Sequence, residues 1–274
     1  MRLTDPLRLS AGGASIPQFG QREITLLDLA THSAGLPREM DIPRPANAQQ
    51  FTWPTRADRW SWLAKYKLPW APGTVAAYSN VGFDILADAL VTAGGKPYSE
   101  LLKERITGPL GMVDTGFNPT KEQCERLMMG SGLGGTVSCV DTEANAGSGG
   151  LYSTGEDMAK WLRHNLATSD PATWPVLTIA HAVYRQRQAM TAAIGFDEAA
   201  PMAGIGLGWI TTAAEGRLPM IVQKSGGGGG FMTYIAFAPG KDVGVFIAVS
   251  RLDFAMFHAL TTSANNLIGN LVTR

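Results

Sequence analysis

Residues 221–237 read Ile-Val-Gln-Lys-Ser-Gly-Gly-Gly-Gly-Gly-Phe-Met-Thr-Tyr-Ile-Ala-Phe. In this stretch Lys224 and Ser225 interrupt an apolar, β-rich pattern, and five glycines, Gly226 to Gly230, follow them. A lysine in an apolar strand is costly unless it has a partner or a task. Glycines in a strand are costly as well, because glycine loses the most conformational entropy on ordering. A glycine-lined edge lets another backbone approach closely, so the stretch predicts an edge where an extended substrate, such as a peptide, lies with its charge near Lys224.

The chain before this stretch is predicted to be mostly helical, with long loops. Thr25, with Asp28 three residues later, predicts a capped helix start. The spacing of apolar residues predicts further helices over 81–91 and about 175–193. Residues 37–59 are rich in Pro, Asn, Gln and Arg, which predicts a long surface loop.

From residue 204 the pattern changes to that of strands. The predicted strands cover 206–212, 220–224, 231–237 and 243–250, and an amphipathic helix is predicted over 253–272. This order predicts an α+β fold, with a mostly helical lobe over 1–200 and an antiparallel sheet with a C-terminal helix over 201–274. A cleft between two such lobes is a common place for a binding site.

Composition excludes several classes of function. Of the 274 residues, 45% are hydrophobic and 17% charged, which is typical of a globular protein. The 23 basic residues equal the 23 acidic ones, and no basic run carries interleaved aromatics, so we expect no nucleic-acid partner. No apolar run approaches the roughly 18 residues of a membrane-spanning helix, and the first residues lack the apolar segment of a signal peptide.

The two cysteines, Cys124 and Cys139, leave two alternatives open. They are either two buried thiols, as in a cytosolic protein, or a disulfide that closes a glycine-rich loop, which requires an oxidising compartment. Their spacing is neither a redox Cys-x-x-Cys nor a zinc site, and the chain shows no other metal-ligand spacing. We therefore expect neither a metal nor a cofactor.

Three other features of the sequence give weaker indications of function. Residues 130–135 fit G-x-G-x-x-G, but no strand is predicted before them, so the match is interpreted as chance in a flexible loop. Ser33 lies in a partial G-x-S-x-G pattern that lacks the first glycine and follows a helix, which makes it a weak nucleophile candidate. The four histidines are scattered and are interpreted as packing or surface residues: His32, His164, His181 and His258.

Tyr78, Asn80 and Lys224 remain as candidates for chemistry. Each alone has an ordinary explanation, namely a packed aromatic, a helix cap and a solvated lysine. Together they are more informative, because Tyr-x-Asn precedes a helix of one lobe and Lys-Ser-Gly lies on a sheet edge of the other. A cleft between the lobes would bring the three side chains together.

These motifs resemble those of a known family. Tyr78-Ser79-Asn80 and Lys224-Ser225-Gly226 are similar to the second and third signature motifs of the serine β-lactamases and penicillin-binding proteins, in the form seen in class C β-lactamases and related D-alanyl-D-alanine carboxypeptidases. The third motif is usually Lys-Thr-Gly, and Ser225 keeps the hydroxyl. The stretches 24–37 and 150–158 also resemble the family, and the similarity covers essentially the whole chain.

The resemblance implies a β-lactamase/transpeptidase-like fold, a periplasmic location, and peptidoglycan peptides or β-lactams as partners. It also implies roles for residues. Tyr78 would be the proton shuttle, because nearby cations favour its phenolate form. Asn80 would hold the substrate amide, while Lys224, Ser225 and Gly226 would bind the substrate carboxylate. The N–H of Gly227 would form half of the oxyanion hole.

One departure concerns the nucleophile. The first motif of the family is Ser-x-x-Lys, and no serine of this chain has a lysine three residues later. In the family this motif precedes the segment that matches residues 2–6. We therefore expect a member that lacks its N-terminal part, with an exposed apolar surface covered by rearrangement or self-association.

Three functions follow from the resemblance. The first is a hydrolase of D-Ala-D-Ala peptides or β-lactams whose nucleophile segment is missing from this chain. The second is a related esterase on the same scaffold. The third is a non-catalytic remnant that binds muropeptides or β-lactams without turnover.

Overall fold

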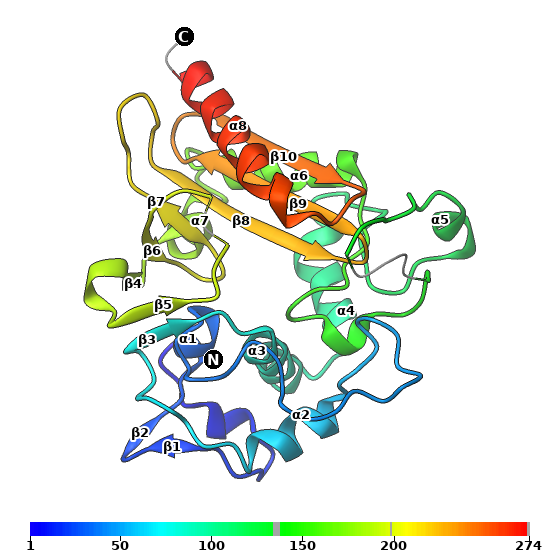
Figure 1. Ribbon diagram of the computed structural model, residues 1–274, viewed down its shortest axis with the longest axis vertical. Coiled ribbons are helices and arrows are strands. Elements are labelled where there is room, and N and C mark those ends of the chain that lie inside the picture. Colours follow the sequence, from blue (N-terminus) through cyan, green and yellow to red (C-terminus); the bar gives the residue numbers. More distant parts are fainter. Residues whose placement is uncertain (134–137, 198, 273–274) are drawn as a thin grey trace.

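The chain folds into a helical layer and a six-stranded antiparallel sheet that is flanked by helices (Figure 1). The structure is a computed structural model that describes residues 1–133, 138–197 and 199–272. The helices are α1 (Leu26–Ala30), α2 (Arg56–Leu63), α3 (Asn80–Gly94), α4 (Tyr98–Leu102), α5 (Lys121–Glu125), α6 (Gly155–Leu166), α7 (Trp174–His181) and α8 (Phe254–Val272). The strands are β1 (Gln18–Phe19), β2 (Arg22–Glu23), β3 (Val75–Ala77), β4 (Arg185–Gln186), β5 (Ala192–Ile194), β6 (Met202–Ile205), β7 (Ile210–Thr212), β8 (Ile221–Gly228), β9 (Phe231–Ala238) and β10 (Val243–Val249).

The sheet has the strand order β10-β9-β8-β7-β6-β4, and every pair in it is antiparallel. Helix α8 covers one face, where Ala264 and Ile268 form a buried cluster with Tyr234 and Ala236 of β9. Helix α6 contacts the same two outer strands, β9 and β10. Figure 1 shows α8 in front of the sheet and α6 behind it. Successive side chains of β9 and β10 therefore point alternately toward α8 and toward the opposite face of the sheet.

The helical layer has a core of its own. Helix α3 contributes Val81, Ile85 and Ala89, which recur every four residues and so lie on one face. They pack against leucines from the first part of the chain, including Leu29 of α1 and Leu63 of α2. This core fixes α3, and with it the residues that begin this helix.

The fold class predicted from the sequence is confirmed. Thr25 caps α1 in a reciprocal capping box with Asp28, as predicted. The predicted strands over 231–237 and 243–250 and the helix over 253–272 correspond to β9, β10 and α8. The division of the chain near residue 200 stays a prediction, and the sheet itself takes one strand, β4, from before that point.

Two predicted elements differ from the structure. The strand expected over 206–212 begins only at Ile210, where β7 starts. The helix expected over 175–193 ends at His181, and the chain continues as β4, a short 3₁₀ turn and β5. Strand β5 pairs in parallel with β3, a contact between distant segments that no local pattern reveals. The ordinary explanation of Asn80 as a helix cap does not apply, because Ser79 caps α3 and accepts the N–H of Gly82 at 2.9 Å.

The glycine run divides into two parts. Gly226 to Gly228 continue β8 to its end, and Gly229 and Gly230 form a two-residue turn into β9, since Gly228 pairs with Phe231. Both turn residues have positive φ, 61° and 78°. A tight hairpin of this kind requires left-handed conformations, which is why glycine occupies both positions.

The two cysteines form a disulfide, which decides between the two alternatives. Cys124 and Cys139 are joined with their Cα atoms 5.8 Å apart. The bond closes the loop that follows α5, part of which (134–137) lies outside the described residues, as do Gly134 and Gly135 of the G-x-G-x-x-G match.

Candidate active site

The structure brings Tyr78 and Lys224 together, although they come from the two different layers. Tyr78 follows β3 directly and lies just before α3, while Lys224 is in the middle of β8. The ammonium nitrogen of Lys224 is 5.0 Å from the centre of the Tyr78 ring. An ammonium group at this distance over an aromatic ring is a favourable cation–π contact.

His32 holds Tyr78 in place through three contacts. Its ring stacks on the Tyr78 ring with centroids 4.4 Å apart. Its backbone oxygen accepts the N–H of Ala77 at 2.8 Å, and its Nδ1 accepts the N–H of Ser79 at 3.0 Å. The residues on both sides of Tyr78 are thus anchored to the same histidine.

The electrostatic state of His32 follows from its surroundings. The side chain is buried, and the rings of Phe83 and Phe196 lie against it. Burial, together with the charge of Lys224, lowers the pKa of His32 to about 3. His32 is therefore neutral at physiological pH, and its free Nδ1 lone pair can accept the bond from Ser79. The interpretation of His32 as a packing residue is too narrow, because the packing serves the candidate catalytic tyrosine.

Two charged residues that the sequence did not single out border Tyr78 and Asn80. The guanidinium carbon of Arg38 lies 4.7 Å from the Tyr78 ring centre, and its Nη1 donates to the Gly195 carbonyl at 3.2 Å. The Asn80 side-chain amide donates to Glu39 Oε1 at 2.5 Å. Arg38 and Glu39 belong to the loop predicted over 37–59, so a loop pattern indicated their location but not their proximity to the site.

Strand β8 offers an open edge beside Lys224. The pairing of β7 with β8 stops at Gln223, so within the described residues β8 pairs from Lys224 to Gly228 with β9 alone. Because Gly228 flanks a two-residue turn, its backbone groups bond to β9, and by alternation those of Ser225 and Gly227 point to the open edge. Gly226 and Gly227 are exposed. The N–H of Gly227 is therefore available to a ligand.

Ser225 has a partner that the sequence did not indicate. Its hydroxyl donates to Asp197 Oδ2 at 3.2 Å, and the Lys224 ammonium donates to the Ser225 carbonyl. A substrate carboxylate at Ser225 would therefore have to replace the Asp197 carboxylate as acceptor. Which of these residues bind substrate stays a prediction.

Ser33 occupies a structural position. It is fully buried, and its hydroxyl lies 2.9 Å from Thr31 Oγ1 and accepts a bond from Arg185 Nε at 3.3 Å. No imidazole or lysine amine is bonded to it in the contacts described. The burial of this hydroxyl argues against a role as a nucleophile.

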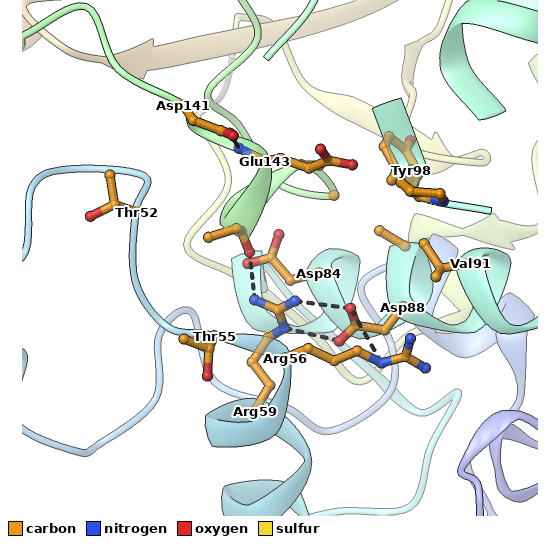
Figure 2. Close-up of a pocket in the computed structure, with 15 residues that line it drawn as sticks. Thr52, Thr55, Arg56, Arg59, Asp84, Asp88, Val91, Tyr98, Asp141 and Glu143 are labelled. Atoms are coloured by element: carbon orange, nitrogen blue, oxygen red, sulfur yellow. Dashed lines mark hydrogen bonds and ion pairs between the residues drawn. The ribbon is translucent and has the colours of Figure 1, made fainter. Parts of the chain in front are cut away.

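A cavity of about 450 Å³ lies elsewhere, between α2, α3 and the segment 141–147 (Figure 2). At its base Arg59 forms a bidentate ion pair with Asp88, with Nε–Oδ2 at 3.1 Å and Nη2–Oδ1 at 2.9 Å. Arg59 also donates to the Ala144 carbonyl. Burial raises the pKa of Asp84 to about 6, against the opposing pull of Arg59. These groups link α2, α3 and the 143–148 segment, and none of the residues predicted for the site lines this cavity.

The described part of the chain contains no cluster of three or more His, Cys, Asp or Glu side chains that could hold a metal ion. None of its described helices is both long and apolar enough to cross a membrane.

The sheet with its flanking helices, and a Tyr-x-Asn turn facing a Lys-Ser-Gly strand, are features of one class of protein. The beta-lactamase family model matches residues 2–269, and the chain belongs to this family. Among its relatives, the D-alanyl-D-alanine-carboxypeptidase/endopeptidase AmpH of Escherichia coli K12 is 42% identical over 272 residues, which are 99% of this chain and 70% of that protein. A beta-lactamase of the same strain is 25% identical over 248 residues, which are 83% of this chain and 63% of that protein.

Solved structures agree with this assignment. The Yersinia pestis beta-lactamase/D-alanine carboxypeptidase, solved with citrate, is similar with a TM-score of 0.90 and 44% identity, over 99% of this chain and 77% of that one. A class C beta-lactamase gives a TM-score of 0.73 at 18% identity, over 97% of this chain and 74% of that one, which supports the fold alone.

Proposed function

We propose that the site binds extended peptides that end in D-Ala-D-Ala, or β-lactams, as a serine-type hydrolase of the family does. The observation that carries the proposal is the open edge of β8 with Lys224 at one end, close to Tyr78. An extended peptide gains affinity at such an edge from backbone hydrogen bonds. A terminal carboxylate gains charge-assisted bonds from a lysine.

Each residue then has a role that its position supports. Lys224 and Ser225 receive the carboxylate, and Gly226 leaves room for it. The outward N–H of Gly227 polarises the scissile carbonyl. Tyr78 transfers the proton, and Asn80 holds the substrate amide. Peptidoglycan peptides are the substrate class we favour, because the AmpH relative of Escherichia coli K12 and the Yersinia pestis protein are both named as carboxypeptidases.

The Ser-x-x-Lys motif, which supplies the nucleophile in the family, does not occur in the 274 residues. Removal of a catalytic nucleophile typically costs several orders of magnitude in rate. This observation favours the non-catalytic alternative for the chain as it stands, which is binding of muropeptides or β-lactams without turnover.

We therefore expect the chain to bind a D-Ala-D-Ala peptide reversibly and to take no covalent label from a fluorescent penicillin. Lys224→Met should raise the dissociation constant roughly tenfold or more, because a hydrogen bond to a charged group contributes about 1.5–3 kcal/mol. Isothermal titration gives the affinity, and gel fluorescence after denaturation gives the label.

Lys241→Met is the matched control, since Lys241 is exposed in the turn between β9 and β10. A covalent label on the wild-type chain would contradict the binding-only candidate. Equal affinity in Lys224→Met would contradict the carboxylate site. Comparing hydrolysis of a short-chain ester with hydrolysis of the peptide distinguishes the esterase alternative from the peptide hydrolase.

We further propose a periplasmic location. The disulfide between Cys124 and Cys139 supports it, because disulfides persist in oxidising compartments. A cell fractionation that found the protein with cytosolic markers would contradict it.

Self-association is also proposed. Strand β10 lies at the end of the sheet and pairs with β9 alone in the described chain. Helix α8 exposes four large apolar side chains nearby, Phe254, Met256, Leu267 and Leu271. We expect sedimentation to show dimers at micromolar concentration, and Phe254→Ser with Leu267→Ser to shift the protein toward monomer. A wild-type monomer throughout this range would contradict the expectation.

A further inference from the structure

The open edge of β8 is closed at its far end by a segment from the other layer. Gln50 and Phe51 belong to the loop that precedes α2, yet they lie against the glycines of the edge. The Gln50 side-chain oxygen accepts the N–H of Gly229 at 3.1 Å. That N–H lies directly beyond β8, so Gln50 occupies the place that a longer ligand would need.

Phe51 fills the space next to it. A Cβ atom built on Gly228 would lie only 2.6 Å from the Phe51 ring, and one built on Gly149 only 2.9 Å from it. The ring is therefore held between two glycine backbones from different parts of the chain. Phe51 also has a φ of 65°, a conformation that costs a bulky residue energy. A strained residue kept at a ligand edge indicates a functional constraint.

From this geometry we infer that Gln50 and Phe51 form an end stop that limits the length of ligand the edge accepts. The inference rests on the proposed function, since it concerns the same edge. Ser225 and Gly229 are four residues apart, about 13 Å at roughly 3.3 Å per residue. With a carboxylate at Ser225, this length accommodates the terminal dipeptide and about two preceding residues. A longer peptide meets the Phe51 ring and competes with Gln50 for the Gly229 N–H.

The test is a pair of peptides with the same D-Ala-D-Ala end, one with two preceding residues and one with five. Isothermal titration should show the long peptide binding wild type at least tenfold more weakly than the short one. In Phe51→Gly the two affinities should differ less than threefold, because glycine adopts the same φ without strain and removes the ring. Gln50→Ala should also reduce the difference in affinity between the two peptides.

Gln49→Ala is the matched control, because Gln49 is an exposed neighbour in the same loop and should keep the wild-type ratio. A ratio that stayed the same in Phe51→Gly and Gln50→Ala would overturn the end stop and leave the proposed function intact. Failure of both peptides to bind wild type would overturn the proposed function, and the end stop with it. A purely structural role for Phe51 would lower the unfolding temperature without a change in the ratio, which would also count against the inference.

Discussion

Replacing Asp28 by alanine should lower the free energy of unfolding by roughly 3 kcal/mol, the lower end of the cost of breaking a buried ion pair, because the two arginines left behind are partly exposed. Asp28 lies in the first turn of α1 with its carboxylate fully buried. Two cations depend on it, since Arg22 and Arg185 each donate to it at 2.8 Å. In the alanine variant both guanidinium groups would lose their charged partner, and the Thr25 capping box would lose its second half.

The same ion pair links the two layers of the fold. Arg185 belongs to β4 of the large sheet, whereas Asp28 belongs to the helical layer. The position of Tyr78 is set by the helical layer and that of Lys224 by the sheet. The distance between the two side chains therefore depends on contacts that link the layers. We therefore expect Asp28→Ala to weaken ligand binding as well, even though Asp28 does not line the β8 edge.

Urea unfolding followed by tryptophan fluorescence measures this effect. Glu23→Ala is the matched control, because the Arg8–Glu23 pair is exposed and such pairs contribute about 0–1 kcal/mol. A loss of less than 1 kcal/mol in Asp28→Ala would show that water or rearrangement replaces the carboxylate, and that the ion pair does not hold the layers together.

The parts of this fold that were predicted correctly depend on local chemistry. The Thr25–Asp28 capping box and the alternation in β9 are properties of a few consecutive residues. The 175–193 prediction failed because an apolar run is compatible with a helix and with short strands. Residues 192–194 form a strand because they pair with β3, which lies in a distant part of the sequence.

The candidate site divides in the same way. Tyr78, Asn80 and Lys224 could be chosen as candidates from the sequence because their motifs are contiguous. Glu39 and Asp197 lie in irregular segments, and only the folded chain places them beside Asn80 and Ser225. A loop lacks the regular repeat of a helix or strand, so the sequence does not show which way a polar side chain in it points. Sequence patterns therefore do not distinguish a loop residue that faces a site from one that faces solvent.

The neutrality of His32 predicts a loss of stability in acid. Its pKa is about 3 in the folded protein, against an ordinary value of 6.5. Between these two values the unfolded chain binds a proton that the folded protein does not. The full contribution to stability is therefore present above pH 6.5 and falls as the pH drops toward 3, by up to roughly 1.4 kcal/mol per pH unit.

Asparagine is the most informative replacement for His32. The backbone there has a φ of 52°, which asparagine tolerates better than most residues, and an asparagine oxygen can accept the Ser79 N–H. His32→Asn removes the titrating group and keeps the anchor. At pH 7 we expect it to be less stable than wild type because the ring stacking with Tyr78 is lost.

Between pH 6.5 and 4.5 the stability of wild type should approach that of His32→Asn by roughly 2 kcal/mol, because only wild type takes up the extra proton on unfolding. Urea unfolding at half-unit pH steps measures the two curves, and all other titrating groups contribute equally to both. His258→Asn, at an exposed position on α8, serves as the control and should follow the wild-type curve. Parallel curves for wild type and His32→Asn would mean that His32 is protonated in the folded protein, and the bond from Ser79 to Nδ1 could then not be what orients Tyr78.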